Sequence, residues 1–117
     1  MSGRRYVFSL NDFLNHILEA IERIETYTAN LTYEEFCQST RDQDAAIRNF
    51  EIIGEACRNI EKSFPDFVVA HPELPIRSAY EMRNALSHAY FGVDLAIVWQ
   101  AIKHDLSHLK QNILRIL

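Results

Sequence analysis

Apolar residues recur at steps of three and four along most of the chain, the spacing that places side chains on one face of an α-helix. The first stripe predicts a helix that starts after Ser9, with Asp12 in the position for a capping box. Phe8 and Phe13 stand where a hydrophobic staple would form. The stripe consists of Leu10, Phe13, Leu14, Ile17, Leu18, Ile21 and Ile24.

Two further helices are predicted before Pro65. Residues 32–35, Thr-Tyr-Glu-Glu, form a second start signal ahead of a short helix. A long helix follows from Ser39 or Thr40, and Pro65 ends it because proline disfavours helical geometry in the residue before it. Residues 64–75 contain all three prolines and are expected to form a loop.

The rest of the chain is predicted to form two more helices. One runs from Pro75 to about Tyr90, and the other begins after Asp94, a favourable N-cap. The five amphipathic segments have short connections, and no stretch alternates with period two. We therefore predict an all-α fold, an up-and-down helical bundle in a single domain over residues 1–117. The apolar stripe of the last helix is Leu95, Val98, Trp99, Ile102, Leu106, Leu109 and Ile113.

Composition agrees with a globular domain and excludes several classes. The chain has 117 residues, 48% of them hydrophobic and 24% charged, which excludes a disordered tail. No apolar run exceeds the five residues 95–99, so no membrane span is expected. The basic start at residues 1–5 has no apolar segment after it, so we expect a cytoplasmic protein without a secretory signal. Cys37 and Cys57 form no CxxC pair and are expected to be small buried hydrophobes.

The net charge of −4 limits how this chain can bind nucleic acid. Proteins that coat nucleic acid by charge alone are usually basic, so binding of that kind, and DNA as a partner, are not expected. An acidic protein can still act on RNA when its cations are concentrated in one cleft.

The densest cluster of reactive side chains is residues 83–90, Arg-Asn-Ala-Leu-Ser-His-Ala-Tyr. RNA is cleaved without a metal when a base takes the 2′-hydroxyl proton, an acid protonates the leaving 5′-oxygen and a cation stabilises the phosphorane. His88 suits the first two roles because the unperturbed pKa of histidine is about 6.5. Arg83 suits the third, since its planar fork matches two phosphate oxygens. One chain supplies one such histidine, so a homodimer is expected to supply the acid–base pair.

Helical geometry constrains how these residues can meet. At about 100° per residue, Arg83 and Tyr90 lie within roughly 20° of each other, while His88 lies roughly 140° from Arg83. An active site therefore needs a helix break near His88 or pairing of Arg83 and His88 across subunits, and we expect both to contribute. Asn84 shares a face with His88, beside Ser87, and is expected to fix the imidazole or contact phosphate.

The pattern Arg, four residues, His, one residue, Tyr resembles the signature of the HepT toxins, a branch of the HEPN domain superfamily. Residues 44–56, DAAIRNFEIIGEA, and the flanks of the motif up to residue 99 resemble that family too, so the resemblance covers essentially the whole chain. Two positions depart from it. Ile76 and Glu81 stand where the family often has Trp and Gly.

The resemblance implies a dimeric helical bundle that acts as the toxin of a toxin–antitoxin system. Its implied activity is cofactor-free, metal-independent cleavage of RNA, with tRNA as one candidate substrate. The resemblance also implies that Arg83 and His88, which occupy the Arg and His positions of the motif, are catalytic. The implied partner is an MntA-type nucleotidyltransferase antitoxin, which neutralises the toxin by adding AMP to Tyr90.

Other readings of the same residues stay open. The motif could be a capping and hydrogen-bond network, or the chain could be a non-catalytic module that docks a nucleotidyltransferase and presents Tyr90. His104 and His108 have the i, i+4 spacing of a two-histidine metal pair, but a solvated face is expected there. His16 is expected to be structural or exposed. The basic residues of the long helix are expected to form an exposed ion-pair face, or in part to line the cleft with Arg77 and bind the RNA backbone. These residues are Arg41, Arg48, Arg58 and Lys62.

Overall fold

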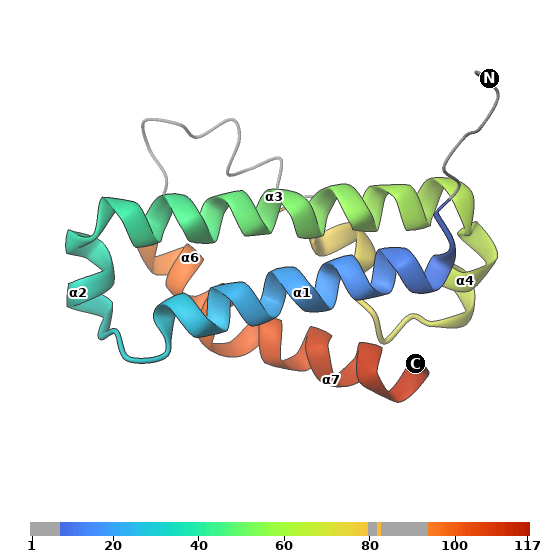
Figure 1. Cartoon of the computed structure of the whole chain (residues 1–117). Coiled ribbons are helices and arrows are strands. Elements are labelled where there is room, and N and C mark those ends of the chain that lie inside the picture. Colours follow the sequence, from blue (N-terminus) through green and yellow to red (C-terminus); the bar gives the residue numbers. More distant parts are fainter. Residues whose placement is uncertain (1–7, 80–81, 83–93) are drawn as a thin grey trace, which may run out of the picture.

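The computed structural model describes residues 8–79, 82 and 94–117, which contain helices and no strand. Figure 1 shows α1 and α3 side by side, with α7 against α1. Residues 76–79 and 82 are also helical. The predicted all-α fold class is confirmed. The helices are α1 (Leu10–Thr28), α2 (Tyr33–Gln38), α3 (Thr40–Ser63), α4 (Pro65–Ala70), α6 (Leu95–Gln100), the π-helical turn η1 (Ala101–Asp105) and α7 (Leu106–Ile116).

The predicted start signals are confirmed for α1 and α2. Ser9 and Asp12 form a capping box, with hydrogen bonds of 2.8 and 3.1 Å between the side chain of each and the backbone N–H of the other. The box at Thr32 and Glu35 has bonds of 2.9 and 3.1 Å. Such boxes satisfy backbone donors that the first helical turn leaves unpaired. Local sequence therefore fixes where these helices begin.

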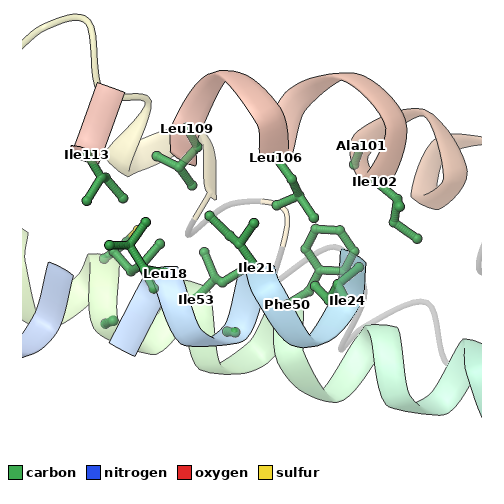
Figure 2. Packing of buried hydrophobic residues seen from close by; sticks show 14 of the residues in the cluster. Leu18, Ile21, Ile24, Phe50, Ile53, Ala101, Ile102, Leu106, Leu109 and Ile113 are labelled. Atoms are coloured by element: carbon green, nitrogen blue, oxygen red, sulfur yellow. The ribbon is translucent and has the colours of Figure 1, made fainter. Parts of the chain in front are cut away.

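The core forms where the apolar stripes of α1, α3 and α7 meet. Figure 2 shows Ile21 of α1 near Ile53 of α3 and near Leu106 and Leu109 of α7. Each fully buried side chain of this size contributes roughly 1.5–3 kcal/mol through removal from water. The polar residue Asn49 is buried beside them. Its Nδ2 donates to the carbonyl of Ala45 at 2.9 Å, but its Oδ1 has no hydrogen-bond partner among the described residues.

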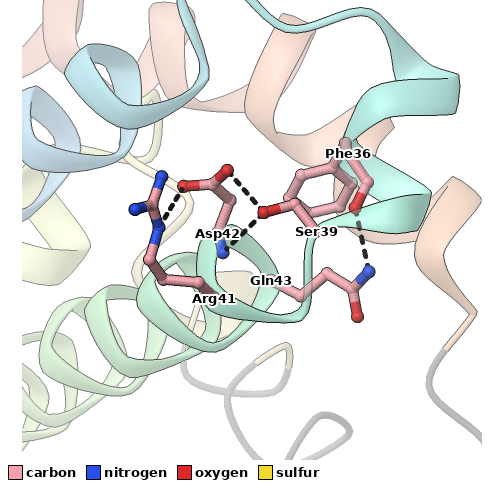
Figure 3. A network of polar contacts seen from close by, with 5 residues as sticks. All are labelled: Phe36, Ser39, Arg41, Asp42 and Gln43. Carbon is pink, nitrogen blue, oxygen red and sulfur yellow. Dashed lines mark hydrogen bonds and ion pairs between the residues drawn. The ribbon is translucent and has the colours of Figure 1, made fainter.

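A network of short polar contacts turns the chain from α2 into α3 (Figure 3). The Ser39 hydroxyl donates to the Asp42 carboxylate at 2.6 Å and accepts from the Asp42 N–H at 3.3 Å. Gln43 donates to the backbone carbonyls of Phe36 and Cys37 at 2.9 and 3.0 Å. These bonds occupy carbonyls at the end of α2 and donors at the start of α3, so the two helices need almost no linker.

The prediction of a loop over residues 64–75 is wrong in part, because α4 occupies Pro65–Ala70. Pro65 stands at the first position of this helix, where its missing N–H would be unpaired in any case and its fixed φ suits the helix. Phe67 and Val68 are half-buried against the core. A proline that ends one helix here begins the next.

The prediction of one regular helix after Asp94 also needs correction, because η1 separates α6 from α7. The buried positions Val98, Ile102 and Leu106 follow each other at two successive steps of four. A regular helix would rotate Leu106 by about 80° from Val98, and the wider π turn reduces this rotation. Asp94 caps α6 as predicted, with its carboxylate 2.9 Å from the Ala96 N–H.

Polar contacts also join segments that are far apart in sequence. Lys110 of α7 donates to Glu25 of α1 at 2.9 Å, and this hydrogen bond raises the pKa of the lysine. Cys57 is fully buried, and burial raises the pKa of its thiol to about 12, whereas Cys37 is only half-buried. None of the helices within the described residues is long and apolar enough to cross a membrane.

Candidate active site

The motif residues Arg83, Asn84, Ser87, His88 and Tyr90 lie outside the described residues. Their roles therefore stay predictions, and the site is built here from the helices on both sides of the motif.

The segment that leads into the motif is fixed to the core. Leu74 and Ile76 are buried, and Met82 is half-buried and packs against the core one residue before Arg83. Ile76, which stands where the resembled family often has Trp, is only 1% exposed and fills a core position. Arg77 pairs with Glu61 of α3 at 3.3 Å, so part of its charge is already compensated. The approach to the motif is therefore well anchored.

The segment that follows the motif is fixed by an aromatic cluster around Trp99. Its ring centroid lies 5.2 Å from that of Phe36 and 6.0 Å from that of Tyr33, and Lys103 Nζ lies 4.5 Å from it. A hydrogen bond with the Cys37 side chain and, to a smaller extent, the negative charge of Asp94 raise the pKa of Tyr33, which favours its neutral hydroxyl. The helix that follows the motif, α6, therefore packs against α2 through Trp99.

A hollow of about 350 Å³ lies next to Met82, and we call it the Met82 hollow. It opens between α3, residues 75–79 with Met82, and the junction of η1 with α7. Its walls are mainly apolar, with a few polar side chains. The lining residues are Phe50, Ile53, Pro75, Ser78, Ala79, Met82, Ala101, Asp105, Leu106, His108 and Leu109.

Two other predictions can be examined on the described helices. His104 and His108 are exposed, and no group of three or more His, Cys, Asp or Glu residues that could hold a metal ion occurs within residues 8–79, 82 and 94–117. The ion-pair face of α3 is present, with Arg41 3.8 Å from Asp42 and Arg48 3.5 Å from Glu51.

Sequence reasoning missed a larger hollow of about 790 Å³ between α1 and α3, which we call the α1–α3 groove. Phe8, Phe13, His16 and Phe64 form its aromatic side. The polar side carries residues of α3 at steps of three and four, a spacing that every solvent-exposed helix face shares. These are Arg48, Glu51, Glu55, Asn59 and Ser63.

Comparison with known proteins decides the family. The model described as "Ribonuclease HepT-like" matches residues 17–116, a span that includes the motif and both anchoring segments. This chain belongs to the HepT-like ribonuclease family. The resemblance predicted from the motif is thereby confirmed, and so, at the level of the family, is the expectation of an enzyme that cleaves RNA.

Curated relatives agree with this family assignment. The chain is 46% identical over 102 residues to the "Probable ribonuclease HepT" of Thermococcus cleftensis, covering 87% of this chain and 90% of that protein. It is 36% identical over 105 residues to a "Putative RNase" of Methanocaldococcus jannaschii, covering 90% and 84%. No solved structure matches significantly.

Proposed function

We propose that this protein is a metal-independent endoribonuclease, with His88 as acid–base catalyst and Arg83 as the cation that stabilises the transition state. The 2′-oxygen attacks the adjacent phosphorus while a histidine takes its proton. The bond to the 5′-oxygen breaks as a second histidine donates a proton to it. The products are a 2′,3′-cyclic phosphate and a 5′-hydroxyl. The guanidinium neutralises the charge on the equatorial oxygens of the phosphorane.

The chemistry requires two copies of this chain. One chain carries one motif histidine, and a single imidazole cannot be base and acid at two oxygens in the same step. A two-fold homodimer would place a second His88 in a shared cleft. It would also let Arg83 of one protomer work with His88 of the other, although the two lie on different sides of a straight helix.

The observation that carries the proposal is the family match over residues 17–116, because it spans the whole motif rather than the helices alone. The described structure supports it in one further respect. Met82 and Asp94 immediately flank residues 83–93, and each is tied to the bundle, by core packing and by a helix cap. Both ends of the segment that carries the motif are therefore fixed to the bundle.

Incubation with cellular RNA in EDTA tests the proposal. We expect the wild-type protein to cut RNA under these conditions and to leave new 5′-hydroxyl ends, detected by labelling with a kinase without prior phosphatase treatment. Ends that carry a 5′-phosphate, or cleavage that EDTA abolishes, would contradict the mechanism. No cleavage by the wild-type protein would contradict the activity and favour a partner-binding module.

We further propose that the chain is the toxin of a toxin–antitoxin pair and that a nucleotidyltransferase of MntA type neutralises it at Tyr90. The tyrosine oxygen would attack the α-phosphorus of ATP and release pyrophosphate. The AMP group would add a bulky anion close to Arg83, occupy the phosphate site and repel RNA.

Tyr90→Phe should escape this modification, because the variant lacks the acceptor oxygen. With partner, ATP and Mg²⁺, we expect intact-mass spectrometry to find one AMP group on the wild-type protein and none on Tyr90→Phe. Tyr33→Phe, which removes another partly exposed tyrosine hydroxyl, serves as the control and should gain AMP like the wild type. An equal mass gain on Tyr90→Phe would place the modification elsewhere.

A further inference from the structure

The α1–α3 groove has an aromatic side that is built and partly open. The ring centroid of Phe8 lies 5.7 Å from that of Phe13 and 5.2 Å from that of His16. Phe64, which directly follows α3, continues the cluster, with its ring centroid 6.4 Å from that of Phe13. Phe13 is buried, whereas Phe8 is 48% exposed. Phe13 therefore packs the cluster against the core, while part of the Phe8 ring faces the groove and solvent.

The opposite side of the groove is rich in hydrogen-bond acceptors. Glu51 accepts from Arg48 at 3.5 Å, and Arg48 is largely exposed at the edge. Asn59 is half-buried and makes no side-chain hydrogen bond among the described residues, so both ends of its amide can still be used. Glu55 adds a second carboxylate to this side. With more carboxylates than guanidinium groups, the groove does not suit a phosphate.

Aromatic rings beside such acceptors suit a nucleobase. Unpaired bases of RNA are recognised by stacking on aromatic side chains and by hydrogen bonds to their edges. Carboxylate and carboxamide oxygens accept from exocyclic amino groups, which adenine, guanine and cytosine have and uracil lacks. The volume of about 790 Å³ is ample for one base and its ribose.

We propose that the α1–α3 groove binds one unpaired, amino-bearing base of the RNA substrate, stacked on Phe8 and read by Asn59. The inference rests on the proposed ribonuclease function for the identity of the ligand. It adds a substrate-binding region on a pair of helices outside the motif.

Equilibrium binding of short single-stranded oligonucleotides tests this proposal, with the full chain carrying His88→Ala so that no cleavage interferes. We expect Phe8→Ala and Phe8→Leu to raise the Kd for oligo(A) about tenfold, because both remove the ring on which the base stacks. Asn59→Ala should raise it by about fivefold. Oligo(U) should bind the unsubstituted groove at least about fivefold more weakly than oligo(A).

Tyr27→Ala is the matched control, since Tyr27 is an aromatic residue of α1 with 43% exposure that lies outside the groove. It should leave the Kd unchanged, and circular dichroism should show that all variants fold. An unchanged Kd in Phe8→Leu, or an equal rise in Tyr27→Ala, overturns the inference. Because binding is measured without cleavage, loss of the proposed catalysis would not alter this outcome. If Phe8→Ala with an intact His88 cleaves RNA with an unchanged KM, the proposed base-binding role of the groove is overturned, whereas the proposed ribonuclease function is not.

Discussion

His88→Ala is expected to slow RNA cleavage by about 10²- to 10⁴-fold, because it removes the side chain that would transfer both protons. The measurement is a single-turnover rate on a defined RNA in EDTA, with enzyme in excess so that product release does not limit it. His104→Ala is the matched control, since His104 is an exposed histidine on η1 outside the motif. A rate within about twofold of wild type in the His88 variant would remove the histidine from the mechanism.

The same variant tests whether the active site needs two chains. Wild-type and His88→Ala chains are refolded together in equal amounts, so that dimers form at random. If one shared cleft requires both imidazoles, only dimers with two wild-type chains cut RNA, and activity falls to about a quarter of that of an all-wild-type sample. If each chain acts by itself, activity falls only to about half. A value near one half would contradict the shared cleft but leave the ribonuclease activity intact.

Ile21→Ala is expected to lower the free energy of unfolding by about 2–5 kcal/mol, the largest change in stability that we predict. Ile21 has no exposed surface and lies where α1, α3 and α7 meet (Figure 2). Its truncation leaves a cavity that three helices would have to move together to fill. Urea unfolding followed by circular dichroism gives the change in free energy.

Leu114→Ala is the control for this experiment. Leu114 lies on α7 but is 54% exposed, so its truncation should change the free energy of unfolding by no more than about 0.5 kcal/mol. Domains of this size are stabilised by only about 5–15 kcal/mol, so Ile21→Ala should remove a large share of the total. Equal effects of the two substitutions would show that the three stripes do not form one cooperative core.

The predictable parts of the fold were those decided within a few residues. A capping box involves only one turn of chain, so the starts of two helices can be predicted from their capping residues. These are Ser9 with Asp12 and Thr32 with Glu35. α4 does not follow from the sequence in the same way, because Pro65 both ends α3 and suits the first turn of a new helix. η1 has no distinct sequence signal, because the steps of four between Val98, Ile102 and Leu106 also occur in ordinary helices.

The candidate site divides in a similar way. Arg83, His88 and Tyr90 stand out in sequence because reactive residue types at fixed spacing form a recognisable motif. The α1–α3 groove did not stand out, because Phe8 had a sufficient local explanation as a staple residue and Asn59 is one polar residue among many on α3. Only the packing of α1 against α3 brings these two residues to one hollow. A site shared between distant helices has no local signature.

The π turn at Ala101–Asp105 has a consequence for how the length of this chain can change. A deletion of one residue inside most helices of the bundle would rotate everything beyond it by about 100° and take its stripe off the core. Inside this turn, the same deletion can be absorbed by rewinding to regular α-helical geometry, and Leu109 and Ile113 would keep their places. Natural length variants of the C-terminal helix should therefore cluster at this turn and be rare within α1 and α3.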